Sequence, residues 1–171
     1  MKINSKTIIW AIKIIVWLVF ASIIIFLTLE KLAPGGQVVY RTDFSGRERF
    51  IQNFYPKGKM NLVNGFALVS SEPVYLDVYS PKKFSRAKAK IVYSSPNLEA
   101  KFGVKLNVNA WGFYFEEMPP TGDGFKEITL EFNLAKAEIA NNKLKFAIAC
   151  PGVDAEKNLI MIDSIEITLT K

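Results

Sequence analysis

The longest apolar run of the chain extends over Ile8–Leu29 and is interrupted only by Lys13, Ser22 and Thr28. Its second part, Ile14–Leu29, carries no charged residue. As an α-helix with a rise of about 1.5 Å per residue, the run is roughly 33 Å long, which matches a hydrocarbon core about 30 Å thick. The pattern therefore predicts a transmembrane helix.

The charges beside this run predict its orientation. Lys2, Lys6 and Lys13 lie at its N-terminal end with no acidic residue among them, whereas Glu30 and Lys31 cancel at the other end. Positive residues favour the cytoplasmic side, so we expect the N-terminus in the cytoplasm and the rest of the chain outside the cell membrane.

A cleaved signal peptide is the alternative, because such peptides also begin basic and then turn apolar. The run is longer than the roughly 7–15 apolar residues of a signal peptide, and Ala33-Pro34-Gly35 matches a cleavage site imperfectly. We therefore expect a single-pass signal-anchor protein. Its parts would be a basic cytoplasmic N-terminus (1–6), the anchor helix (7–30), a linker (31–37) and an extracytoplasmic domain (38–171).

In that domain, apolar and polar residues alternate with a period of two. The clearest runs are 74–79, 101–109, 128–132, 143–149 and 165–170. Pairs that contain Gly, Pro or Asn separate the runs, as expected of turns. Because neighbouring residues on a strand point to opposite faces, each run has one buried and one solvated face. The pattern is typical of an all-β protein with an antiparallel β-sandwich or barrel.

Composition limits the function of this domain. Four of the 22 basic and one of the 16 acidic residues lie in 1–31, which leaves 18 and 15 and a net charge of +3 in the remainder. That charge is spread along the sequence, so no nucleic-acid interface is expected. The single Cys150 lies in an apolar stretch and is expected to be a buried thiol with a structural role.

Catalysis is not expected. The chain contains no His, which excludes the commonest general base and the catalytic triads that use it. Glu116 and Glu117 form the only adjacent pair of acidic residues, and on a strand they point to opposite faces. They therefore cannot flank one glycosidic bond, and we predict no catalytic residues.

One candidate binding constellation consists of Lys105, Asn107, Asn109 and Trp111. Their odd numbering places them on one face of a continuous strand. Amide groups donate and accept hydrogen bonds with sugar hydroxyls, and an indole stacks on the apolar face of a pyranose. The alternative is an ordinary solvated face, with Trp111 folded over the edge of the sandwich.

A second stripe, Tyr75, Asp77 and Tyr79, lies on the face opposite the aliphatic residues of its run. Ligand contact is one interpretation. Aromatic pairing between neighbouring strands explains the same residues without a ligand.

Asp163 shares the parity of the apolar residues Ile165, Ile167 and Leu169, so an unbroken strand would point it into the core. A buried carboxylate needs a partner. Either a β-bulge turns Asp163 outward, or it meets backbone N–H groups, Arg41 or a calcium ion.

Several segments together resemble galactose-binding-like jelly-roll domains, a fold that many carbohydrate-binding modules share. They are Tyr40-Arg41-Thr42-Asp43-Phe44, the stretch 123–130 beginning Asp123-Gly124-Phe125, the strand 143–149, and the stretch 160–167 with its Ile162-Asp163 pair. The resemblance implies a jelly-roll β-sandwich. In some related modules acids on the first and last strands hold structural calcium, and the matching positions here are Asp43 and Asp163. Two carboxylates alone fall short of the six to eight oxygens usual for calcium.

Two hypotheses of function follow. The first is a membrane-anchored, non-catalytic module that binds carbohydrate or a glycan of the cell envelope. The second is an envelope assembly or adhesion protein that binds other proteins through the sandwich. The first predicts an aromatic and amide-bearing surface around Trp111, and the second predicts an exposed apolar patch or a free strand edge.

Overall fold

The computed structural model describes residues 5–31, 36–45, 50–108, 112–154 and 158–171. The chain divides into two compact units, Met1–Gly35 and Gly36–Lys171. The second unit begins two residues before the domain predicted from the sequence.

The first unit contains one helix, α1 (Ser5–Lys31). Ser22 Oγ and Thr28 Oγ1 donate hydrogen bonds to carbonyl groups four residues earlier, at 2.8 and 2.6 Å. Among the described residues, which leave out the side chains of 5–9, 11 and 29–31, no helix is both long and apolar enough to cross a membrane. The helix that we expected at 7–30 is present, but its assignment as a transmembrane signal anchor is not supported.

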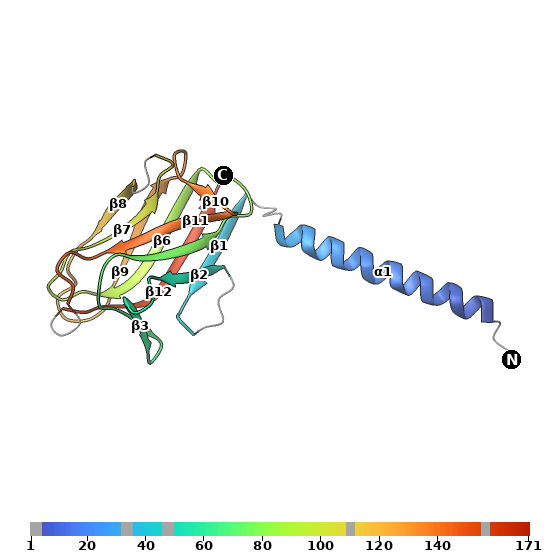
Figure 1. Ribbon diagram of the computed structural model, residues 1–171, viewed down its shortest axis with the longest axis horizontal. Coiled ribbons are helices and arrows are strands. Elements are labelled where there is room, and N and C mark those ends of the chain that lie inside the picture. The colour runs from blue at the N-terminus through green and yellow to red at the C-terminus, as the bar shows by residue number, and fades with distance from the viewer. Residues whose placement is uncertain (1–4, 32–35, 46–49, 109–111, 155–157) are drawn as a thin grey trace. The chain divides into compact units, whose positions relative to one another are not determined.

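The second unit is a β-sandwich of two antiparallel sheets (Figure 1). Sheet A has the order β3 (Met60–Val63), β4 (Phe66–Val69), β12 (Ile160–Thr170), β6 (Arg86–Ser94), β9 (Lys126–Asn133), and β1 (Gln37–Thr42) also pairs with β12. Sheet B has the order β2 (Ile51–Tyr55), β5 (Val74–Tyr79), β11 (Lys143–Ala149), β7 (Ala100–Lys105), β8 (Phe113–Met118), and β10 (Ile139–Ala140) also pairs with β11. The predicted all-β sandwich is confirmed.

The core lies between the inner faces of the two sheets. Alternate residues of β5, β7, β11 and β12 are at most 1% exposed, and Leu76 and Ile167 among them have no exposed surface. Phe132 of sheet A packs edge-on against Phe102 and Phe146 of sheet B, with ring centroids 6.0 and 5.9 Å apart. The sequence predicted this alternation for these strands. Burial of the apolar face removes it from water and is the main source of their stability.

The last strand, β12, organises sheet A. One of its edges pairs with β4 through 160–162 and with β1 through 165–170, and its other edge pairs with β6 along most of its length. The register with β6 shifts between Ile162 and Ser164, so Asp163 is the extra residue of a β-bulge. Asp163 is half-buried while Ile165 is fully buried. Of the interpretations offered for Asp163, the bulge is confirmed.

Candidate functional site

Four aromatic side chains form a row across the outer face of sheet B, and we call them the aromatic row: Tyr55, Tyr75, Phe113 and Phe115. Successive ring centroids lie 5.3, 5.8 and 5.6 Å apart. The row begins on edge strand β2 and ends on edge strand β8, so it crosses the sheet. Phe115, which lies at the β8 end of the row, is 36% exposed.

Two small residues let these rings lie against the sheet. Tyr75 of β5 is paired with Ala147 of β11, Ala147 with Gly103 of β7, and Gly103 with Phe115 of β8. Ala147 is only 1% exposed although it lies on the outer face, since the rings cover it. A Cβ on Gly103 would lie 2.5 Å from Cδ1 of Phe115, so only glycine admits the ring at this position.

Charged side chains lie beside the aromatic row, and we call them the charged cluster: Asp77, Lys105, Glu138, Lys143 and Lys145. The Nζ of Lys105 pairs with the carboxylate of Glu138 at 2.7 Å, and that of Lys143 with Asp77 at 3.8 Å. The Nζ of Lys145 lies 5.5 Å from the ring centroid of Tyr55. A hydrogen bond with Tyr55 raises the pKa of Lys145 above its ordinary value.

A hollow of about 190 Å³ opens between these groups, lined by Tyr55, Asp77, Glu138, Ala140, Asn141, Lys143 and Lys145. It combines ammonium donors, carboxylate acceptors and an aromatic face. Sugars have hydroxyl groups around the ring edge and C–H groups on the faces, so this combination suits them. The hollow and the aromatic row together form the candidate site.

The structure brings together three of the residues predicted from the sequence. Tyr75 belongs to the aromatic row, and Asp77 and Lys105 belong to the charged cluster. Tyr79 lies further along β5 and packs on Phe50, with ring centroids 5.7 Å apart. The predicted aromatic pairing between strands is confirmed for Tyr75, which is the register partner of Tyr55.

We predicted one continuous strand from Lys105 to Trp111, and for the residues up to 108, which the structure describes, this prediction is wrong. β7 ends at Lys105, and Asn107 lies in an exposed bend whose backbone N–H donates to the carbonyl of Lys136 at 2.7 Å. Hydrogen bonds to that neighbouring loop replace the sheet pairing that a longer strand would need. Asn109 and Trp111 lie outside the described residues, so their role in binding stays a prediction.

Sequence reasoning left Tyr55 and Lys145 out of the site. Phe113 and Phe115 follow Trp111 closely in the sequence, which indicated that they could lie over the binding surface, but a place in the core was the alternative. Tyr55 and Lys145 reach the site through the strand order β2-β5-β11-β7-β8, which no local pattern contains.

The two acidic residues considered for calcium have other neighbours. Asp43 Oδ1 accepts the backbone N–H of Ser45 at 3.1 Å, and Asp163 Oδ2 accepts the hydroxyl of Ser164 at the same distance. Within the described part of the chain, no group of three or more acidic, His or Cys side chains is placed to hold a metal ion. The described donors do not fit a calcium site, and calcium at Asp43 and Asp163 stays an untested prediction.

The pair considered for acid–base chemistry behaves as predicted. In β8, Glu116 is the register partner of Phe102 and Glu117 that of Lys101, so the two carboxylates lie on opposite faces. Glu116 accepts a short hydrogen bond from the hydroxyl of Tyr114, which raises the pKa of that tyrosine.

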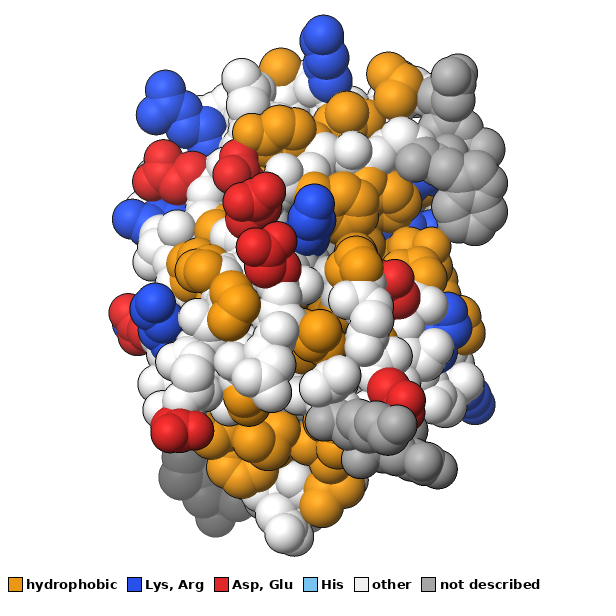
Figure 2. Space-filling view, turned by 90° about the vertical axis from the view of Figure 1, so that its left-hand side faces the viewer, with side chains coloured by type: hydrophobic (Ala, Val, Ile, Leu, Met, Phe, Trp, Pro, Cys, Tyr) orange, Lys and Arg blue, Asp and Glu red, His pale blue; other side chains and the backbone are white. Residues whose placement is uncertain are grey.

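Figure 2 shows hydrophobic side chains interspersed with acidic and basic ones on the side of the domain that faces left in Figure 1.

The predicted burial of Cys150 is confirmed, since its side chain has no exposed surface. Its backbone N–H donates to Glu72 Oε2 at 2.6 Å. Burial, together with the charge of Glu72, raises the pKa of the thiol to about 12. A buried thiol that stays protonated is unreactive at neutral pH, so Cys150 takes no part in the candidate site.

Comparison with known proteins finds a similar fold in solved structures of carbohydrate-binding modules. No family model and no curated protein matches the chain. Among solved structures, a variant of a family 29 carbohydrate-binding module is similar with a TM-score of 0.56 and 16% identity, over 77% of this chain and 91% of that one. Another variant, solved in complex with mannohexaose, has a TM-score of 0.56 and 15% identity over 77% and 90%. A xylan-binding module of family 15 has a TM-score of 0.50 and 14% identity over 78% and 97%. At such identities the likeness shows a shared β-sandwich fold.

Proposed function

We propose that the unit Gly36–Lys171 is a non-catalytic carbohydrate-binding module, and that it binds a neutral glycan on the outer face of sheet B. The observation that carries this proposal is the aromatic row, which crosses that face and ends at the exposed ring of Phe115. Aromatic side chains that cover part of a solvated sheet face have no role in the core between the sheets. Stacking on sugar rings accounts for their position.

The charged cluster supports the same function. Lys105 is held by the carboxylate of Glu138 at 2.7 Å, and Lys143 lies 3.8 Å from that of Asp77. Hydroxyl groups of a sugar can then hydrogen-bond to charged groups that need little reorganisation. Solved structures with this fold include modules whose names state that they bind xylan or that were crystallised with mannohexaose, which makes a β-linked polysaccharide the first ligand to test.

Isothermal titration of the full chain with mannohexaose, cellohexaose and xylohexaose tests the proposal. We expect at least one to bind, and Tyr75→Ala and Phe115→Ala to weaken that binding at least tenfold. Phe125→Ala is the matched control, because Phe125 is 46% exposed and stacks on Phe66 of sheet A. Equal binding by Tyr75→Ala and the parent chain would overturn the site, and no binding of any of the three would favour the assembly role.

The location of the domain is a separate part of the proposal and rests on the sequence alone. The uncharged stretch Ile14–Leu29 and the lysines that precede it support an extracytoplasmic domain tethered at the membrane by the N-terminal segment. Protease added to intact cells should digest the domain and leave a short N-terminal fragment with the membrane. A domain that resists protease until the cells are lysed would contradict this location.

A further inference from the structure

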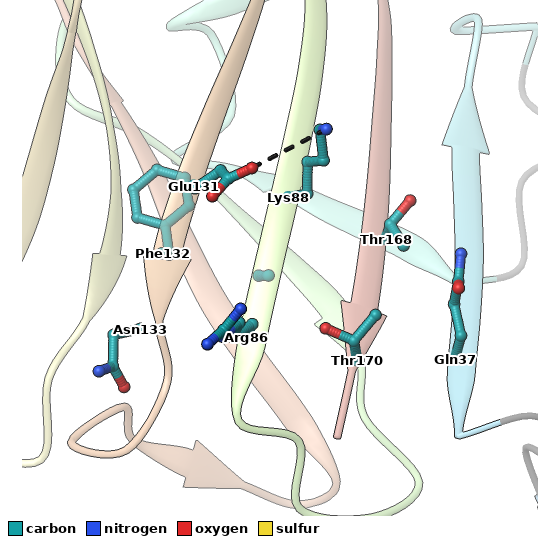
Figure 3. Close-up of a pocket in the computed structure, with 9 residues that line it drawn as sticks. Gln37, Arg86, Lys88, Glu131, Phe132, Asn133, Thr168 and Thr170 are labelled. Carbon is teal, nitrogen blue, oxygen red and sulfur yellow. Dashed lines mark ion pairs between the residues drawn. The ribbon is translucent and has the colours of Figure 1, made fainter.

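A second hollow lies on the outer face of sheet A, away from the aromatic row. Its volume is about 440 Å³, within the range of roughly 300–1,000 Å³ that small-molecule sites occupy. Seven side chains from four strands line it with polar groups (Figure 3): Gln37, Arg86, Lys88, Glu131, Asn133, Thr168 and Thr170. A glycan bound on sheet B would not reach it, because the sandwich core separates the two outer faces.

Most cations of this face that lie on β6 have an acidic partner on β9. Lys88 is the register partner of Glu131 and pairs with it at 3.8 Å, and Lys90 pairs with Glu127 at 2.9 Å. Lys90 reaches Glu127 diagonally, since its own register partner is Thr129. The register partner of Arg86 is Asn133, so an amide stands opposite Arg86.

The groups around Arg86 offer donors. Asn133 Oδ1 accepts the backbone N–H of Ala135 at 2.9 Å, so the NH₂ group of the amide is left to donate. A guanidinium has only donors. On the other side of Arg86 its register partner is Thr170, whose hydroxyl donates or accepts. The single carboxylate of the hollow, Glu131, is paired with Lys88.

The backbone holds this arrangement from both sides. Ser85 donates its N–H to the carbonyl of Thr170 at 2.9 Å, and its own carbonyl accepts the N–H of Leu134 at 2.8 Å. The start of β6 is therefore tied to the end of β12 and to the end of β9. A binding site on strands that are held in this way loses little conformational entropy when a ligand binds.

We propose that this hollow is a second ligand site, which binds the carboxylate of an acidic sugar, with Arg86 and the NH₂ group of Asn133 as its donors. The charges of Arg86, Lys88 and Glu131 leave the hollow one positive charge, which suits one carboxylate. Gln37, Thr168 and Thr170 add amide and hydroxyl groups for sugar hydroxyls. The two described apolar side chains that border the hollow, Ala87 and Phe132, are 1% and 2% exposed, so an acidic peptide finds no apolar pocket there.

Titration of the full chain with trigalacturonate, and with galactotriose as its neutral counterpart, tests this site. We expect trigalacturonate to bind, and Arg86→Gln to weaken the binding at least tenfold. Asn133→Asp keeps the acceptor for Ala135 and places an acid opposite Arg86, so we expect a similar loss with the fold intact. Arg41→Gln is the control, because Arg41 lies on the same outer face opposite Glu166 and outside the hollow.

The remaining arms separate this site from other interpretations. Tyr75→Ala should leave trigalacturonate binding unchanged, since it lies on sheet B, so this site and the neutral-glycan site fail independently. No binding of trigalacturonate, or equal binding by Arg86→Gln and the parent chain, would overturn the proposal. Equally tight binding of galactotriose, of an oligoglutamate of the same charge or of inorganic phosphate would also overturn it, because each shows recognition of something other than an acidic sugar.

Discussion

The ring of Phe115 occupies the space above Gly103 that a side chain would otherwise fill. The nearest atoms to a Cβ on Gly103 would be Cδ1 of Phe115 at 2.5 Å and the backbone carbonyl oxygen of Tyr114 at 2.6 Å. A ring can turn away, but the backbone of the paired strand β8 cannot move without breaking the sheet. The contact therefore links the end of the aromatic row to the pairing of β7 with β8.

Gly103→Ala should lower the free energy of unfolding by about 1–3 kcal/mol, because the added methyl group overpacks this contact. It should also weaken glycan binding by displacing Phe115. Urea unfolding and titration with the best hexasaccharide measure the two effects. Lys101→Ala, on the same face of the same strand, should change stability by less than about 0.5 kcal/mol. A Gly103→Ala protein as stable as its parent would contradict the close approach.

The two ion pairs Lys105–Glu138 and Lys88–Glu131 should differ in strength because they differ in burial. The side chains of the first are 15% and 31% exposed at 2.7 Å, and those of the second are 57% and 75% exposed at 3.8 Å. Double-mutant cycles with Met and Gln should give a coupling energy of about 1 kcal/mol for the first pair and below about 0.5 kcal/mol for the second. Equal coupling energies would show that the charged cluster is as solvated as the outer face of sheet A.

Stability should fall at alkaline pH. Burial raises the pKa of Cys150 from 9.0 to about 12 and that of Tyr40 from 10.0 to about 12, with the charge of Tyr79 adding to the shift of Tyr40. Between about pH 9 and pH 12 the unfolded chain has lost protons that the folded chain keeps, so the free energy of unfolding decreases as pH rises. Below about pH 8 both states are protonated and the effect is absent.

Urea unfolding at about pH 8 and about pH 10.5 measures this decrease. Cys150→Ala removes one of the two groups, so the variant should lose less stability than the parent over the same interval. If the stability of parent and variant depended on pH in the same way, the thiol would ionise as readily in the folded protein as in the unfolded chain.

Adjacent residues of β12 should respond in opposite ways to the same substitution. Ile167→Asp places an unpaired carboxylate in the core, where Ile167 has no exposed surface, and should cost several kcal/mol out of a typical total of about 5–15. Thr168→Asp changes the half-buried outer face and should leave the protein folded. Circular dichroism melts distinguish them, and a folded Ile167→Asp protein would contradict the assignment of inner and outer faces.

The alternation of residues predicted the sandwich and most of its buried faces, since burial depends on a period that is local to each strand. Val74, Leu76 and Val78 are fully buried, as their spacing implied. The bulge at Asp163 was one of two interpretations, because a break in parity does not by itself show whether the backbone or the side chain adapts. Here the backbone adapts, and β6 pairs with β12 on both sides of the bulge.

The candidate site was less predictable, since it is made of neighbours across strands. Tyr55 and Lys145 are 90 residues apart in sequence. They lie close together because their strands, β2 and β11, both pair with β5 in sheet B. At the end of β7 and just beyond it, the carbonyl of Lys105 and the N–H of Asn107 hydrogen-bond to the loop around Lys136 instead of to a neighbouring strand. Such tertiary contacts leave no periodic signal in the sequence.

The position of β12 has a consequence for how the chain is made. The last strand of the domain, β12, is the one with which β1, β4 and β6 all pair, so sheet A lacks its centre until the ribosome has synthesised residues 160–170. The earlier strands of sheet A meanwhile carry apolar faces without a partner, and contacts of such long sequence separation form slowly. The domain should therefore fold only after β12 has been synthesised, and a truncation before residue 160 should leave an unfolded, protease-sensitive chain.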